Sequence, residues 1–192
     1  MRNPIGRTIS QYRSLRNPSN YEPNWRDLYT TEQVAALDFC QAATFSDVIH
    51  CTEEAVLGHF VNVQTRMLSD HEVKLHDLMS ADLRRKVILE SACENLVGKI
   101  DFLGIHEMMY SSLALLKQET GIDGAVAHLN ASIAYDVDLS PRDLARLRDL
   151  LDLDLQLYEL ALGVFRRRVD CTPEGDLVCR GAVPRTVVRQ RC

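Results

Sequence analysis

The 192-residue sequence lacks the features of a membrane or secreted protein. It has no apolar run near the 18 or more residues that span a bilayer. Its Arg-rich start also lacks the apolar segment of a secretory signal peptide. These residues therefore predict a soluble, cytoplasmic chain with no membrane segment, although an upstream targeting or anchoring segment would be lost together with any missing N-terminal sequence.

Metal-binding patterns are also missing. The six cysteines form no Cys-x-x-Cys pair and the six histidines show no i, i+4 spacing, so we expect no metal site. Asp149, Asp152 and Asp154 resemble a metal-binding run only superficially, because apolar residues separate them, and a solvated face is the favoured interpretation. Cys171 and Cys179 flank a Pro-Glu-Gly-Asp turn and would pair only in an oxidising compartment.

The net charge of −5 is unevenly distributed. Residues 1–28 carry five Arg against two acidic residues, and residues 166–192 carry seven Arg against three. The stretch between them holds ten basic and 22 acidic residues, which argues against nucleic acid as a partner because phosphate backbones attract clustered Lys and Arg. The length and the 46% hydrophobic content are typical of one globular domain.

The first sixteen residues carry the most specific pattern. They predict the end of a buried strand that turns through Asn3-Pro4 into a helix, with Asn3 as cap and Pro4 in the first turn. Arg2 on that turn and Ser10 about two turns into the helix offer a guanidinium and a hydroxyl to a phosphate. An ordinary amphipathic surface helix would show much the same composition, so this segment alone leaves both interpretations open.

The string Arg2-Asn-Pro-Ile-Gly-Arg-Thr-Ile-Ser-Gln-Tyr12 resembles the 3′-phosphate-binding segment of sulfotransferases that use 3′-phosphoadenosine-5′-phosphosulfate, approximately Arg-Asp-Pro-hydrophobic-Glu-Arg-x-x-Ser-x-Tyr. Asn and Gly replace the Asp and Glu of the family pattern, and neither change removes an anion donor. The resemblance implies that Arg2 and Ser10, with Arg7, bind the 3′-phosphate of this co-substrate.

Two later blocks extend the resemblance to about residue 169 and bring it closest to the carbohydrate-sulfotransferase branch. Residues 94–116 are similar to a family helix followed by a strand ending in Phe-x-Gly-hydrophobic-x-Glu. Residues 154–165 are similar to the closing Asp-x-x-Leu-Tyr helix. Glu107 falls on a signature position, but a structural use of its carboxylate at a helix start is sufficient, and we assign it no catalytic role.

The family's Pro-Lys-x-Gly-Gly-Thr-Ser loop, which holds the 5′-phosphosulfate, does not occur in the sequence. By resemblance, that loop and the usual His or Glu base would precede Met1. We therefore expect a truncated sulfotransferase that is inactive alone, with a partial domain at residues 1–169 and a C-terminal tail at residues 170–192. The expected fold is α/β and P-loop-NTPase-like, mostly helical, with one or two short parallel strands remaining.

Hydrophobic periodicity and capping residues predict the individual elements. Helices are expected at residues 31–39, 45–50, 53–60, 80–97, 107–120 and 140–169, with an extended piece at 61–66 and a buried strand at 100–105. In the extended piece, Asn62, Gln64 and Arg66 either face a cofactor or acceptor or form a polar surface strand. The wide apolar face of the last helix predicts exposed apolar surface and self-association.

Two functions from different classes remain open. The first is sulfuryl transfer from the nucleotide donor to an acceptor hydroxyl, with a carbohydrate acceptor implied by the resemblance alone. The second is a non-enzymatic helical protein that keeps the sulfotransferase scaffold and binds a partner protein through exposed apolar faces. A nucleotide sulfate donor and a glycan are the partners of the first hypothesis, and neither hypothesis includes a metal.

Overall fold

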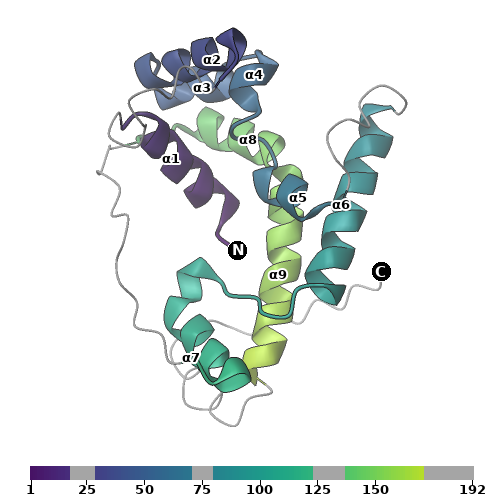
Figure 1. Ribbon diagram of the computed structural model, residues 1–192. Helices are drawn as coiled ribbons and strands as arrows, with labels where there is room; N and C mark the ends of the chain where they lie inside the picture. The colour runs from purple at the N-terminus through teal and green to yellow at the C-terminus, as the bar shows by residue number, and fades with distance from the viewer. Residues whose placement is uncertain (18–28, 71–79, 123–136, 171–192) are drawn as a thin grey trace.

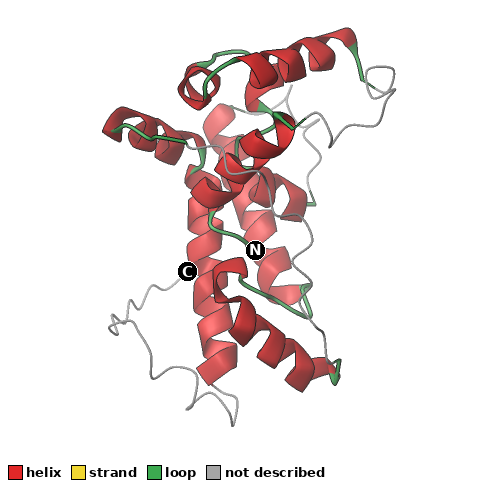
Figure 2. Cartoon of the chain, turned by 90° about the vertical axis from the view of Figure 1, so that its left-hand side faces the viewer, coloured by secondary structure: helices red, strands yellow, loops and turns green. Residues whose placement is uncertain are grey.

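The computed structural model describes residues 1–17, 29–70, 80–122 and 137–170. Every regular element in these ranges is a helix, and they contain no strand (Figures 1 and 2). The helices are α1 Pro4–Leu15, α2 Thr31–Ala42, α3 Phe45–His50, α4 Glu54–Leu57, α5 Val63–Leu68, α6 Ala81–Gly98, the short 3₁₀ helix η4 His106–Met108, α7 Met109–Thr120, α8 Pro141–Leu150 and α9 Asp152–Asp170.

Helix termini follow the capping residues in the sequence. Asn3 Oδ1 accepts from the Gly6 backbone N–H at 3.2 Å, with Pro4 at the start of α1 as expected. Ser80 caps α6, and Ser140 forms a reciprocal capping box with Asp143 at the start of α8. α7 ends at Gly121, whose φ of 73° is the left-handed conformation expected of a glycine C-cap.

Two hydrophobic cores are joined by the α8–α9 pair. The first lies among α1, α2, α3, α4 and α8, and the second lies between α6, α9 and the 100–115 segment (Figure 1). Leu147 and Leu151 belong to the first core, whereas Leu157 and Phe165 belong to the second, and all four are fully buried. α9 is therefore the central element against which the other parts are positioned.

The prediction of one continuous helix at residues 140–169 is wrong at Leu151. This residue has φ −110° and ψ 17°, and it separates α8 from α9. Shortly after the break, the Asp154 backbone N–H donates to Asn62 Oδ1 at 3.1 Å. In an unbroken helix this N–H would donate to the backbone carbonyl four residues earlier. The local sequence shows only helical periodicity and does not reveal this long-range contact.

Both extended segments were also predicted incorrectly. Residues 100–105 form no strand, because a strand requires a ladder and only Met1 pairs with this segment among the described residues. Met1 N donates to Gly104 O at 2.8 Å and His106 N donates to Met1 O at 2.9 Å, which is the pattern of a single parallel pairing. Residues 61–66 include the start of α5, which follows Asn62.

The apolar face of α8 and α9 is largely covered by the two cores. The large apolar side chains that are most exposed lie elsewhere in the described ranges, on α5, α6, α7 and their neighbours. Leu83 on α6 is 48% exposed, because the first half of α6 extends beyond the rest of the molecule (Figure 1). None of the described helices is long and apolar enough to cross a membrane. The tail and the proposed Cys171–Cys179 pair lie outside the described residues.

Candidate anion-binding site

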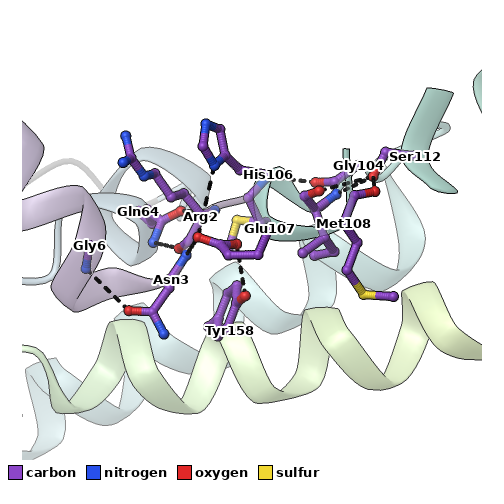
Figure 3. Close-up of polar contacts among 12 residues, drawn as sticks. Arg2, Asn3, Gly6, Gln64, Gly104, His106, Glu107, Met108, Ser112 and Tyr158 are labelled. Atoms are coloured by element: carbon purple, nitrogen blue, oxygen red, sulfur yellow. Dashed lines mark hydrogen bonds and ion pairs between the residues drawn. The ribbon is translucent and has the colours of Figure 1, made fainter. Parts of the chain in front are cut away.

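The N-terminal residue of the predicted phosphate segment is fixed by α5. The Arg2 backbone N–H donates to Gln64 Oε1 at 3.0 Å, and Gln64 Nε2 donates to Arg2 O at 2.9 Å. This two-point contact holds the Arg2 peptide, while the Arg2 side chain extends away from Glu107 and Tyr158 (Figure 3). A Cβ added at Gly6 would lie 4.0 Å from Arg2 Nε, so the guanidinium lies over the first turn of α1.

Arg7 lies in the next turn of α1 and faces the turn between α4 and α5. Its Nη2 donates to Phe60 O at 2.7 Å and to Thr8 Oγ1 at 3.2 Å. Burial lowers the pKa of Arg7; the carboxylate of Asp154 opposes this effect, and the positive charges of Arg66 and Arg2 add to it. The structure therefore brings Arg2 and Arg7 close enough for their charges to interact.

Ser10 is half-buried and lies one turn beyond Arg7. The buried residues of α1 are Pro4, Thr8, Tyr12 and Leu15, and Ser10 lies on the opposite side of the helix from this stripe. Among the hydrogen bonds of the described residues, none joins Ser10 to either arginine. The structure thus groups Arg2 with Arg7 and places Ser10 beside them along α1 without a direct contact.

Tyr12, the last residue of the motif, has a structural contact. Its side chain is 3% exposed, and its hydroxyl donates to Ala43 O at 2.8 Å. Its ring also packs against Phe45, with 5.0 Å between the ring centroids. Tyr12 therefore anchors α1 against the α2–α3 junction and fixes the helix that carries Arg7 and Ser10.

The interpretation of Asp154 as part of a solvated face is wrong. Asp154 is fully buried: its Oδ1 accepts from the Thr65 N–H and from the Thr65 hydroxyl, both at 2.7 Å, and its Oδ2 accepts from the Gln64 N–H at 3.2 Å. A carboxylate that accepts the first free N–H groups of α5 acts as a cap supplied by a distant helix. Sequence reasoning missed this role because the three acidic residues have similar local surroundings.

Asn62, Gln64 and Arg66, for which a cofactor-facing and a surface interpretation were left open, have three different environments. Asn62 has φ 47°, is 5% exposed and binds the Asp154 backbone. Gln64 holds Arg2, and Arg66 Nη2 donates to Gly58 O. The three residues therefore connect the start of α9, the start of α1 and the α4–α5 turn, rather than lining a polar surface strand.

Glu107 connects α1, η4 and α9. Its Oε1 accepts from the Asn3 N–H at 2.8 Å and its Oε2 accepts from the Tyr158 hydroxyl at 2.9 Å (Figure 3). Partial burial alone would raise the pKa of Glu107, but the hydrogen bonds from the Asn3 backbone, its own backbone and Tyr158 hold it below its ordinary value. Burial and the Glu107 contact raise the pKa of Tyr158. These contacts fit the structural use expected for this carboxylate.

A shallow, mostly apolar pocket of about 240 Å³ lies against α7, beside the pairing of Met1 with residues 104–106. Phe102, Met109 and Leu113 are among its lining residues. It offers few polar groups, so the cationic residues around Arg2 and Arg7 are the better candidate for binding an anion. No group of His, Cys, Asp and Glu side chains within the described ranges is arranged to hold a metal ion.

Comparison with known proteins finds similarity to sulfotransferases. The chain is 25% identical over 180 residues to heparan-sulfate 6-O-sulfotransferase 2 of Gallus gallus. This match covers 88% of the chain and 43% of that protein. It is 26% identical over 178 residues to heparan-sulfate 6-O-sulfotransferase 1 of Homo sapiens, with the same coverage of 88% and 43%. It is 33% identical over 112 residues to heparan-sulfate 6-O-sulfotransferase 2 of Danio rerio, which covers 56% of the chain and 24% of that protein.

The chain thus spans less than half the length of these curated relatives. No family model matches the sequence. The similarity supports the sulfotransferase resemblance that the three sequence blocks indicated, at the level of distant relatives.

Proposed function

We propose that this chain carries the 3′-phosphate-binding part of a carbohydrate sulfotransferase that uses 3′-phosphoadenosine-5′-phosphosulfate. The observation that carries the proposal is the grouping of Arg2 and Arg7 around the first turns of α1, in the segment that resembles the family's 3′-phosphate motif. The names of the distant relatives support the sulfotransferase assignment and suggest a glycan as acceptor.

The residues present fit a phosphate dianion. No side-chain partner of Arg2 occurs among the described residues, so its planar fork has all its donors available to two oxygens. Arg7 uses Nη2 for Phe60 O and Thr8 Oγ1, which leaves Nη1 without a partner in the described part of the chain. Both oxygens of Asp154, whose charge acts on Arg7, already accept backbone or hydroxyl donors from α5. The arginines therefore retain donors for an external anion.

The bound nucleotide would supply the sulfuryl group, which passes to an acceptor hydroxyl as the acceptor oxygen bonds to sulfur and the bond to the nucleotide phosphate breaks. In this proposal Arg2 and Arg7 bind and orient the ribose end of the nucleotide, and Ser10 adds a hydroxyl donor from the same helix. We assign no residue of this chain to proton transfer or to the sulfuryl group itself.

Affinity chromatography on immobilised adenosine 3′,5′-bisphosphate tests the proposal. We expect the protein to be retained and to elute with free bisphosphate in preference to adenosine 5′-phosphate, because only the former carries a 3′-phosphate. Arg2→Ala should greatly weaken retention, while Arg142→Ala, which removes an exposed arginine of α8, should not. Passage of the wild-type protein without retention would contradict the proposal.

A further inference from the structure

Arg66 faces the same turn as Arg7 but comes from a different helix. Arg66 Nη2 donates to Gly58 O, and Arg7 Nη2 donates to Phe60 O, so the α4–α5 turn holds two guanidinium groups through carbonyls two residues apart. The Nη1 atom of Arg66, like that of Arg7, has no partner among the described residues. Each of these guanidinium groups therefore keeps a terminal nitrogen with free donors.

The position of Arg66 relative to Arg2 is also fixed. Gln64, two residues before Arg66, holds the Arg2 peptide on both sides, and Asp154 caps the start of the helix that carries Arg66. The start of α5 is thus attached to both α1 and α9. These contacts fix the backbone of α5 at Arg66, and the bond to Gly58 O holds its guanidinium.

The grouped charges have little compensation within the described part of the protein. The partners of Arg7 and Arg66 at this turn are neutral carbonyl oxygens, and neither arginine has an ion pair within hydrogen-bond distance there. Burial, followed by the charge of Arg66, lowers the pKa of His59 on the same turn, which disfavours a positive charge on this imidazole. Asp154, whose negative charge acts on both arginines, uses its oxygens to cap α5. The charge of Asp154 acts on both Arg7 and Arg66, and Arg2 adds a third positive charge next to Arg7, so the local excess of positive charge favours a bound anion.

We propose that Arg66 is a third guanidinium of the anion site, binding the same 3′-phosphate dianion as Arg2 and Arg7. This inference rests on the proposed function, because it names a further ligand-binding residue at that site.

Isothermal titration calorimetry with adenosine 3′,5′-bisphosphate and with adenosine 5′-phosphate tests the inference on the whole chain. Arg66→Gln should weaken bisphosphate binding by about 10- to 100-fold, the usual effect of losing one charge-assisted contact. Binding of adenosine 5′-phosphate should change less than about twofold. The matched control Arg142→Gln removes one exposed arginine on α8 and should leave both affinities unchanged.

A second measurement avoids any dependence on the folding of the variant. In the wild-type protein, modification by phenylglyoxal followed by mass spectrometry should show Arg66 protected by the bisphosphate but not by adenosine 5′-phosphate, while Arg142 reacts equally in both. If the wild type does not prefer the bisphosphate, the proposed function fails and this inference fails with it. If the wild type prefers the bisphosphate and Arg2→Ala loses that preference, but Arg66 is unprotected and Arg66→Gln binds normally, only the assignment of Arg66 is overturned.

Discussion

Replacing Asp154 with Asn should destabilise the protein although the two side chains have the same shape. Asp154 accepts three hydrogen bonds at the start of α5, two from Thr65 at 2.7 Å and one from the Gln64 N–H at 3.2 Å. An Asn has one acceptor oxygen. If this oxygen faces Thr65, the NH₂ group faces the Gln64 N–H, so a partly buried donor would lie against another donor.

The magnitude follows from these contacts. A buried N–H left without an acceptor costs about 1–3 kcal/mol. The two remaining bonds also weaken because their acceptor is no longer charged, and charge-assisted bonds are roughly twice as strong as neutral ones. We therefore expect Asp154→Asn to lower the free energy of unfolding by about 2–4 kcal/mol.

Urea denaturation followed by far-UV circular dichroism measures this loss. Asp149→Asn provides the control, since Asp149 is an exposed residue of α8 with the same change of charge, and should alter stability by less than about 0.5 kcal/mol. Equal, small effects of the two variants would show that Asp154 does not cap α5 and would refute the account of how Arg2 and Arg66 are positioned.

Three further predictions concern neighbouring contacts. Gln64→Ala should weaken binding of adenosine 3′,5′-bisphosphate with little change in the melting temperature, and should have a much smaller effect in an Arg2→Ala background, measurable as a double-mutant cycle by calorimetry. Hydrogen bonds from the Ser140 and Ser46 hydroxyls hold the pKa of Asp143 at about 2, below the value near 3.9 expected when unfolded, so its stabilisation is present above about pH 4 and is lost toward pH 2. Thermal unfolding across this range should show a weaker pH dependence for Asp143→Asn than for the wild type. Tyr158→Phe removes one hydrogen bond to Glu107 and should reduce the free energy of unfolding by about 1 kcal/mol, measured by urea denaturation; no change would mean that this contact is not formed in solution.

The sequence was sufficient to predict most helices because their signals are local. Asn3-Pro4, Ser80 and Ser140 each mark a helix start through a contact within three residues, and Gly121 marks an end through its own backbone conformation. Such contacts depend only on neighbouring residues, and so the pattern alone identifies them.

The errors occurred where distant segments decide the structure. The break at Leu151 and the burial of Asp154 both depend on the segment 62–65, about 90 residues away. The predicted strand at residues 100–105 has the apolar composition of a buried strand, but the described residues provide only Met1 to pair with it. Hydrophobic periodicity predicts which face of a helix or strand is apolar. It does not predict which distant segment packs against that face.

The resemblance implied Arg2, Arg7 and Ser10 as site residues, and their role in binding stays a prediction. In the structure the charge of Arg2 acts on Arg7, whereas Ser10 contacts neither arginine. The sequence did not predict the role of Gln64. It left open whether Gln64 faces a cofactor or lies on a polar surface strand, and neither interpretation included a contact with the Arg2 backbone. Only the fold shows that α5 meets the start of α1.

The central claim is that the first turns of α1 bind the 3′-phosphate of an adenosine nucleotide through Arg2 and Arg7. Nitrogen-15 NMR of the arginine side chains tests it most directly, with Arg2→Lys and Arg7→Lys used to assign the two Nε–Hε signals. Adenosine 3′,5′-bisphosphate should shift both signals at concentrations where adenosine 5′-phosphate leaves them unchanged. Signals that stay in place with the bisphosphate, or that move equally with both nucleotides, would contradict the claim.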